Sequence, residues 1–128
     1  MLHHVSVGVA DIDRSISLYD AMLAPLGYVR VWSDLRTGEQ GQAVGYGLPN
    51  SGDKLALKHR PHRQTSTTAD GFHLAFAAPD QTAVDAFYEA ALSNGAKDNG
   101  PPAHRIIVRL SVTLYGESWI AVLHTASR

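Results

Sequence analysis

The stretch LHHVSVGVADIDRSISLYDAMLAPLGY at residues 2–28 decides the fold, because the chain repeats its pattern once further along. The second copy is GFHLAFAAPDQTAVDAFYEAALSNGAKDNG at residues 71–100. A shift of 69 positions superposes several identical residues: His4, Asp11, Tyr19, Ala21 and Leu23 fall on His73, Asp80, Tyr88, Ala90 and Leu92. A repeat that preserves the order of such residues indicates one supersecondary unit present twice.

Each copy begins with an alternating segment and continues with a helical one. In residues 2–10, valines at odd positions alternate with His4 and small residues, which predicts a strand with one aliphatic face and one free face. Asp11 is then a predicted N-cap, and the apolar stripe after it predicts a helix that ends near Gly27. The second copy gives the same features in the same order: a strand over residues 72–77, a cap at Asp80 and a helix ending near Gly95.

Strand-like runs follow each helix, separated by turns rich in Gly, Pro and Asn. They lie at residues 28–33, 42–48 and 54–59 in the first copy, and at 105–115 and 118–124 in the second, with a short one at 96–99. The sequence therefore predicts an α+β fold of two βαβββ modules, which form a cup-shaped mixed β-sheet with flanking helices. We expect a single domain over residues 1–128, with the modules at about 1–63 and 71–128 and a linker at about 64–70.

Composition excludes several classes of function. Eleven Lys and Arg stand against twelve Asp and Glu, so the chain lacks the basic excess of a dedicated nucleic-acid-binding protein. The absence of Cys removes disulfides, thiolate catalysis and iron–sulfur clusters. No apolar run approaches the roughly 20 residues that span a bilayer. We expect a soluble, cytoplasmic protein that binds neither nucleic acid nor membranes.

The two quoted strings resemble the vicinal-oxygen-chelate superfamily, which contains glyoxalase I, the bleomycin- and fosfomycin-resistance proteins and the extradiol ring-cleaving dioxygenases. The first-strand His-Val, the Asp before a helix that ends in a Tyr-rich turn, and the His-Leu-Ala-Phe of the second module carry this resemblance. It extends over residues 1 to about 100. The scaffold hosts isomerases, lyases, dioxygenases and metal-free binders, so the resemblance does not select one reaction.

The resemblance implies a divalent metal at the centre of the cup, held by residues on the first and last strands of each module. His4 and His73 match the family's first-strand ligand positions. Both also lie at repeat-equivalent positions on the predicted free faces, and neutral imidazole binds Zn, Ni, Mn and Fe. The alternative is that each is an ordinary surface or core histidine.

A third metal ligand is harder to identify. Metal-binding relatives carry a carboxylate on the final strand, but Ile120 occupies that position here and Leu55 occupies the equivalent one in the first module. His124 lies about 13 Å further along the strand, too far for the same ion. Glu117 is the remaining candidate, and a bulge or a one-residue slip would be needed to turn it inward. A donor from a partner chain is the alternative.

Two explanations fit this departure from the family ending. One is divergence. The other is a shifted reading frame. Codons permitted for residues 104–107 and 125–128, read one base earlier, can encode Pro-His-Tyr and Ser-Ile-Glu, which resemble the family's motifs. Sequencing the gene distinguishes the two, since unrelated codons at both places exclude the shift.

Three residues of the first module are predicted to bind the substrate. Trp32 and Tyr46 offer aromatic surface, and Lys58 begins a basic run that attracts an anionic ligand. Packing in the core or in a dimer is the alternative for the aromatic residues, and a solvated loop is the alternative for the basic run.

Two functions remain in view. The first is a small-molecule metalloenzyme of the glyoxalase/dioxygenase type, in which a divalent metal chelates two neighbouring substrate oxygens. The second is a metal-free protein that sequesters a small molecule in the same cup. In either case the resemblance implies a homodimer, and the sequence assigns no catalytic residue beyond the metal ligands.

Overall fold

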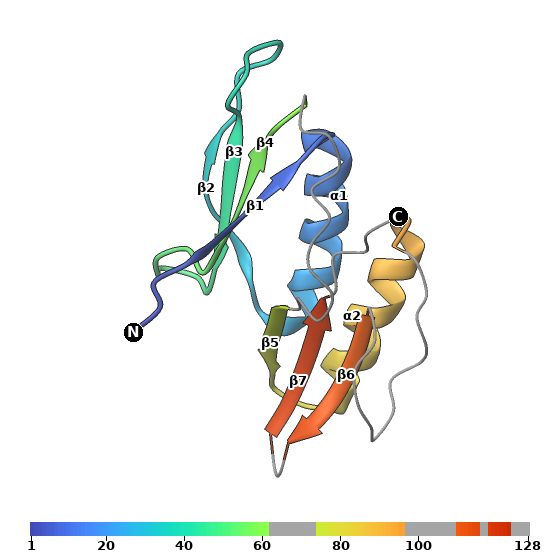
Figure 1. Cartoon of the computed structure of the whole chain (residues 1–128). Coiled ribbons are helices and arrows are strands. Elements are labelled where there is room, and N and C mark those ends of the chain that lie inside the picture. Colours follow the sequence, from blue (N-terminus) through green and yellow to red (C-terminus); the bar gives the residue numbers. More distant parts are fainter. Residues whose placement is uncertain (62–73, 97–109, 116–117, 124–128) are drawn as a thin grey trace.

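The computed structural model describes residues 1–61 and 74–96, together with the backbone of residues 110–115 and 118–123. The elements follow in the order β1 (Val5–Val9), α1 (Ile12–Leu23), the 3-10 helix η1 (Ala24–Leu26), β2 (Val29–Asp34), β3 (Ala43–Gly47), β4 (Leu55–His59), β5 (Leu74–Ala78), α2 (Gln81–Ser93), β6 (Leu110–Tyr115) and β7 (Ser118–Leu123). The predicted α+β fold is confirmed (Figure 1).

The first module is a complete βαβββ unit. Its four strands form one sheet in the order β1-β4-β3-β2, in which β1 runs parallel to β4 and the other neighbours are antiparallel. The valines of β1 are half-buried while Ser6 and Gly8 are exposed, as the alternation predicts. A mixed sheet with one covered face and one free face is the result.

Both predicted helix caps are present. The Asp11 side chain accepts a hydrogen bond from the Arg14 backbone N–H at 3.0 Å, and the Asp80 side chain accepts one from that of Ala83 at 2.8 Å. Each carboxylate satisfies a donor that the first helical turn leaves free. After η1, Gly27 adopts a φ of 84°, a left-handed conformation that glycine reaches without steric cost.

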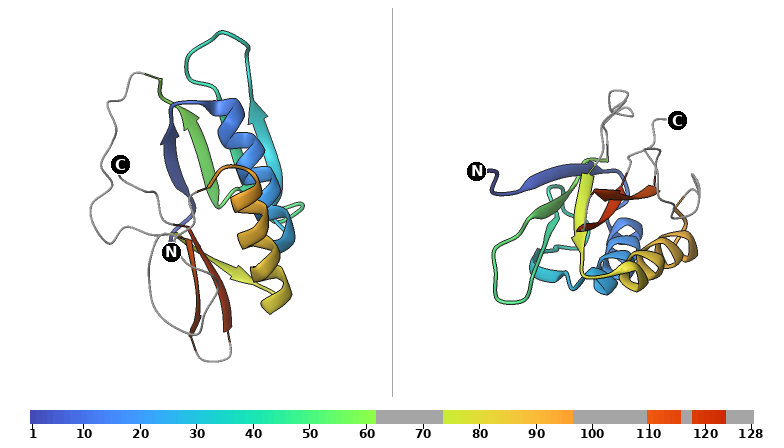
Figure 2. Two further views of the ribbon diagram at one scale, coloured as in Figure 1. Left: turned by 90° about the vertical axis from the view of Figure 1, so that its right-hand side faces the viewer. Right: turned by 90° about the horizontal axis from the view of Figure 1, so that it is seen from below.

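The two helices pack side by side, and their apolar stripes share one core with the strands beneath them (Figure 2). The core takes side chains from both modules: Ile12, Ile16, Tyr19, Met22, Leu23, Leu26, Val44, Tyr46, Leu55, Leu57, Phe76, Ala83, Phe87 and Ala91. The Tyr28 and Phe76 rings meet edge to face with centroids 5.9 Å apart, which ties the start of β2 to β5. The modules are therefore joined by a common apolar interior.

The described part of the second module differs from the first. Its strands form a sheet in the order β5-β7-β6, and β7 runs antiparallel to β5, whereas β4 runs parallel to β1. Three strands follow α1, whereas two described strands follow α2. Most of the predicted strand at 96–99 and the predicted linker at 64–70 lie outside the described residues. In the part that the structure describes, the second unit is βαββ.

Candidate functional site

One face of the four-stranded sheet lies opposite α1, and we call it the open face. Strand register identifies its members, because directly paired residues point to the same side of a sheet. Ala56 is paired with both Ser6 and Gly45, Lys58 with Gly8, and Trp32 with Gly45. Ala43 is paired with Lys58, and Asp34 with Ala43. The open face therefore includes Ser6, Gly8, Trp32, Asp34, Ala43, Gly45, Ala56 and Lys58.

A β-bulge turns Trp32 onto the open face. Arg30 is paired with Tyr46 but Trp32 with Gly45, so the register shifts between them and residues of the same parity point to opposite sides. The Trp32 indole lies directly over Gly45, where a β-carbon would overlap the ring. Trp32 keeps 38% of its surface exposed, so one side of the indole remains available to a ligand.

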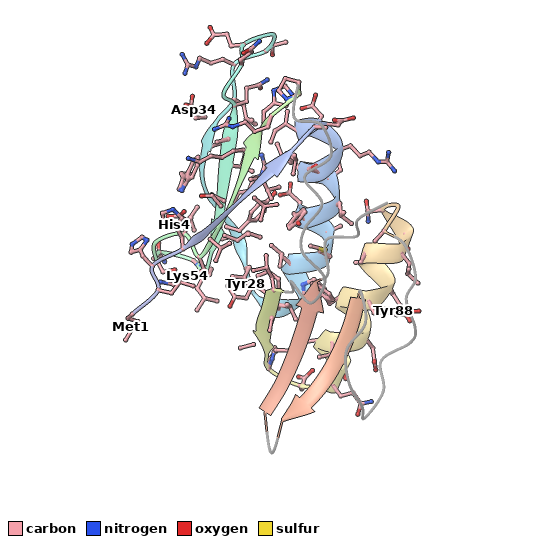
Figure 3. The ribbon with its side chains drawn as sticks, viewed as in Figure 1. Met1, His4, Tyr28, Asp34, Lys54 and Tyr88 are labelled. Atoms are coloured by element: carbon pink, nitrogen blue, oxygen red, sulfur yellow. The ribbon has the colours of Figure 1, made fainter. Side chains whose placement is uncertain are left out.

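His4 lies at the N-terminal end of β1, beside the turn that leads into β4 (Figure 3). Its Nδ1 is 2.9 Å from the Nδ1 of His3 and 4.0 Å from Oδ2 of Asp53. One potential ligand atom from each of these residues lies within 4.8 Å of the others. Both histidines are exposed, and the Asp53 side chain is 15% exposed.

His3 and Asp53 are the residues that sequence reasoning missed. The sequence offers one indication that the two residues belong together. Asp53 comes two residues before the start of β4, just as His3 comes two residues before the start of β1. It becomes informative once β1 and β4 are known to be parallel neighbours, because the starts of parallel strands lie at the same edge of the sheet.

Of the other predicted site residues, Lys58 lies exposed on the open face with Trp32. Tyr46 lies on the opposite side of the sheet, in the core, with 1% of its surface exposed. Its hydroxyl donates a hydrogen bond to Asp20 at 2.9 Å, and Asp20 also contacts the Arg30 Nε at 3.2 Å. The structure therefore separates Tyr46 from Trp32 and Lys58.

The predicted metal ligands His73 and Glu117 lie outside the described residues, as do residues 104–107 and 125–128. Of the predicted ligand set, His4 has a described place, and it stands beside two donors that had not been predicted.

A cavity of about 500 Å³ lies at the other end of β1 and β4. Polar residues dominate its lining, among them Asp11, Asp13, Glu39, Gln42 and His59. The Nε2 of His59 lies 3.1 Å from the Ala10 carbonyl oxygen, and its Nδ1 is buried without a hydrogen-bond partner among the described residues. This cavity contains none of the predicted site residues.

A βαβββ sheet whose free face carries small residues, an indole and a lysine defines a class of protein, a small-molecule-binding α+β scaffold. The chain matches the family model of the Glyoxalase/Bleomycin resistance protein/Dioxygenase superfamily over residues 1–113, and it belongs to that superfamily. A comparison with curated proteins finds no match. None of the described helices has the length and apolar character needed to cross a membrane.

Proposed function

We propose that the protein is a small-molecule metalloenzyme of the glyoxalase/dioxygenase type, which binds its ligand on the open face beside a divalent cation held by His4. The observation that carries this proposal is the position of His4. It precedes Ser6 and Gly8 with the same parity as these open-face residues, and it has further imidazole and carboxylate donors next to it.

The open face offers a ligand three kinds of contact. Ser6 and Gly8 are exposed and small, so they leave room above β1. Trp32 supplies an aromatic surface, and Lys58 supplies a positive charge for a carboxylate or another anion. These residues bind and orient a small molecule without any change in the strands.

The residues near His4 fit a divalent cation, because imidazole nitrogen and carboxylate oxygen are ligands of Zn, Mn and Fe. A cation bound there supplies a Lewis acid that polarises an oxygen of the ligand. In the arrangement that the sequence predicts, His73 and Glu117 complete the ligand set from the second module. The general base that an isomerase would need is not assigned.

The test is calorimetric titration of chelator-treated, tag-free protein with Zn²⁺ and Mn²⁺. We expect one site per chain or per dimer, lost in His4→Ala and retained in His59→Gln, which changes a histidine at the other end of β4. The metalloenzyme proposal is contradicted if His4→Ala still binds one ion per site, or if the wild type shows no stoichiometric binding.

A metal-free binder is the second candidate, favoured by the composition of β7. This strand has the sequence SWIAVL and carries no carboxylate where the resemblance expects a metal ligand. A binder of this kind retains its affinity for a small aromatic anion in excess chelator, measured through Trp32 fluorescence in a Trp119→Phe background. In either case we propose a homodimer, which sedimentation velocity tests.

A further inference from the structure

We infer that His3, His4 and Asp53 form a divalent-metal site contained entirely within the first module. The inference rests on the proposed function for the use of a metal, but it assigns different ligands. His73 and Glu117 are not required, since all three donors come from the starts of two neighbouring strands.

The backbone brings these residues together. The Val5 N–H donates a hydrogen bond to the Lys54 carbonyl oxygen at 3.0 Å, which aligns the first residues of β1 and β4. His4 and Asp53 immediately precede the two bonded residues. Because β1 and β4 are parallel, the chain enters both strands from the same edge of the sheet, and the two side chains meet there.

The turn before β4 holds Asp53 in place through several hydrogen bonds. The Ser51 N–H and hydroxyl both donate to the Leu48 carbonyl oxygen, at 3.0 and 2.8 Å, and the Lys54 N–H donates to the Tyr46 carbonyl oxygen at 2.7 Å. The His3 Nε2 would lie 4.0 Å from a β-carbon on Gly52, so the His3 ring rests against the same turn. A ligand carboxylate on a bonded turn loses little freedom when it binds an ion.

The three donors lie close enough together for one ion to draw them into its coordination sphere. Two nitrogens that each lie about 2.1 Å from a metal are about 3.0 Å apart when their bonds are perpendicular. The two Nδ1 atoms are 2.9 Å apart. The 4.0 Å between His4 Nδ1 and Asp53 Oδ2 exceeds the roughly 3.4 Å that two such bonds span at a tetrahedral angle, so the exposed His4 side chain moves toward Asp53 when an ion binds.

The contact between the two imidazoles also favours a cation. Two Nδ1 atoms at 2.9 Å form a hydrogen bond when one carries a proton and the other does not. The two Nδ1 atoms therefore face each other, and a rotation of each exposed ring turns both toward one ion that lies to the side of the line between them, with the Nδ1 proton released to solvent. Asp53 adds a negative charge that offsets part of the charge of the ion.

Three protein donors leave coordination positions free for ligand oxygens, as in catalytic metal sites. Both histidines are exposed, so these positions are accessible to solutes. His4 stands in line with Ser6 and Gly8, so a chelated ligand would extend over the open face toward Lys58. The exposed Lys58 on that face favours an anionic ligand.

The test compares two sets of variants of the tag-free full chain. His3→Ala and Asp53→Asn remove the inferred ligands, and His73→Ala and Glu117→Gln remove those predicted from the sequence. Zn²⁺ affinity is measured by calorimetry and the ligand field of Co²⁺ by visible absorption.

We expect His3→Ala and Asp53→Asn to weaken Zn²⁺ binding at least about tenfold and to alter the Co²⁺ spectrum, because a change near a metal site already costs that much. His73→Ala and Glu117→Gln should match the wild type. The reverse pattern overturns this inference and leaves the proposed metalloenzyme intact. A wild type that binds neither ion overturns the inference and the metalloenzyme proposal together, and continued ligand binding in chelator then identifies the metal-free binder.

Discussion

Tyr46 shows how a single side chain can be predicted for the site and serve the core instead. Its position in β3 pairs it with Leu55, whose side chain packs under α1. The Tyr46 hydroxyl then finds Asp20 on the helix, and Arg30 reaches the same carboxylate from β2. A buried phenol needs such a partner, so this network orients α1 on the sheet.

Burial gives the two core tyrosines a measurable dependence on pH. It raises the pKa of Tyr19 and of Tyr46 well above the usual value near 10, and the hydrogen bond to Asp20 raises that of Tyr46 further. The folded chain thus keeps protons that the unfolded chain loses above about pH 10, and the unfolding free energy falls there by about 1.4 kcal/mol per pH unit for each tyrosine.

Urea unfolding between pH 8 and 11.5 checks this. Below pH 10 the contribution of both tyrosines to stability is intact, so the curve should be flat with respect to them. Above pH 10, Tyr46→Phe should reduce the slope of the unfolding free energy against pH by about 1.4 kcal/mol per pH unit. At neutral pH it should lower the unfolding free energy by about 1 kcal/mol, because the hydrogen bond to Asp20 is lost. An unchanged slope in Tyr46→Phe would show that the phenol ionises freely in the folded state.

Gly45 is the other residue whose role is set by one neighbour. A β-carbon at this position would overlap the Trp32 indole, so Gly45→Ala must displace the ring. We expect a loss of about 1–3 kcal/mol in stability and a shift in Trp32 emission, measured in a Trp119→Phe background so that Trp32 is the remaining tryptophan. Ser6→Ala, on the same face, is the control and should leave both unchanged.

At the scale of elements, both helices begin with the same device. Asp11 and Asp80 occupy equivalent places in the repeat, and each accepts a hydrogen bond from the residue three positions on. Replacing Asp80 by Ala should cost about 1 kcal/mol of unfolding free energy, and replacing it by Asn should cost much less, because Asn also caps well. Thermal unfolding of the two variants compares these values directly, and equal losses in both would rule out capping as the cause.

The first strand and both helices could be predicted well, because their determinants are local. The alternation of β1, the Asp caps and the apolar stripes of α1 and α2 depend on neighbours a few positions away. The bulge between Arg30 and Trp32 was not predicted, because it depends on how β2 pairs with β3. The bulge decides on which side of the sheet Trp32 lies. The sequence alone therefore could not predict which side chains share the open face.

At the scale of the whole molecule, one core unites the modules. Phe87 of α2 is fully buried and packs near Phe76 of β5, with ring centroids 6.5 Å apart, in the same apolar cluster as α1 and β4. Phe87→Ala should therefore lower stability by about 3–5 kcal/mol and shift the transition of the first module too. Trp32 fluorescence in the Trp119→Phe background reports that module, and an unshifted Trp32 transition would mean that the modules unfold separately.

The candidate site was only partly predictable for a reason that also lies at this scale. His4 was found because a repeat and a strand pattern mark its position within the sequence. Asp53 reaches it through the parallel pairing of β1 with β4, a contact between segments far apart in the chain. No local pattern encodes that pairing, so the two histidines and the carboxylate become a cluster once the topology is known.

The pairing of β1 with β4 also affects how the chain folds during translation. β1 lies at the edge of its sheet, and its neighbour β4 begins fifty positions further along, where Leu55 meets Val5. During translation β1 therefore leaves the ribosome before β4 has been synthesised. Until then β1 is unpaired and its valine side chains are exposed. Such distant closure slows folding and leaves an aggregation-prone strand exposed. Ser6 and Gly8 keep one face of the unpaired strand free of large apolar side chains.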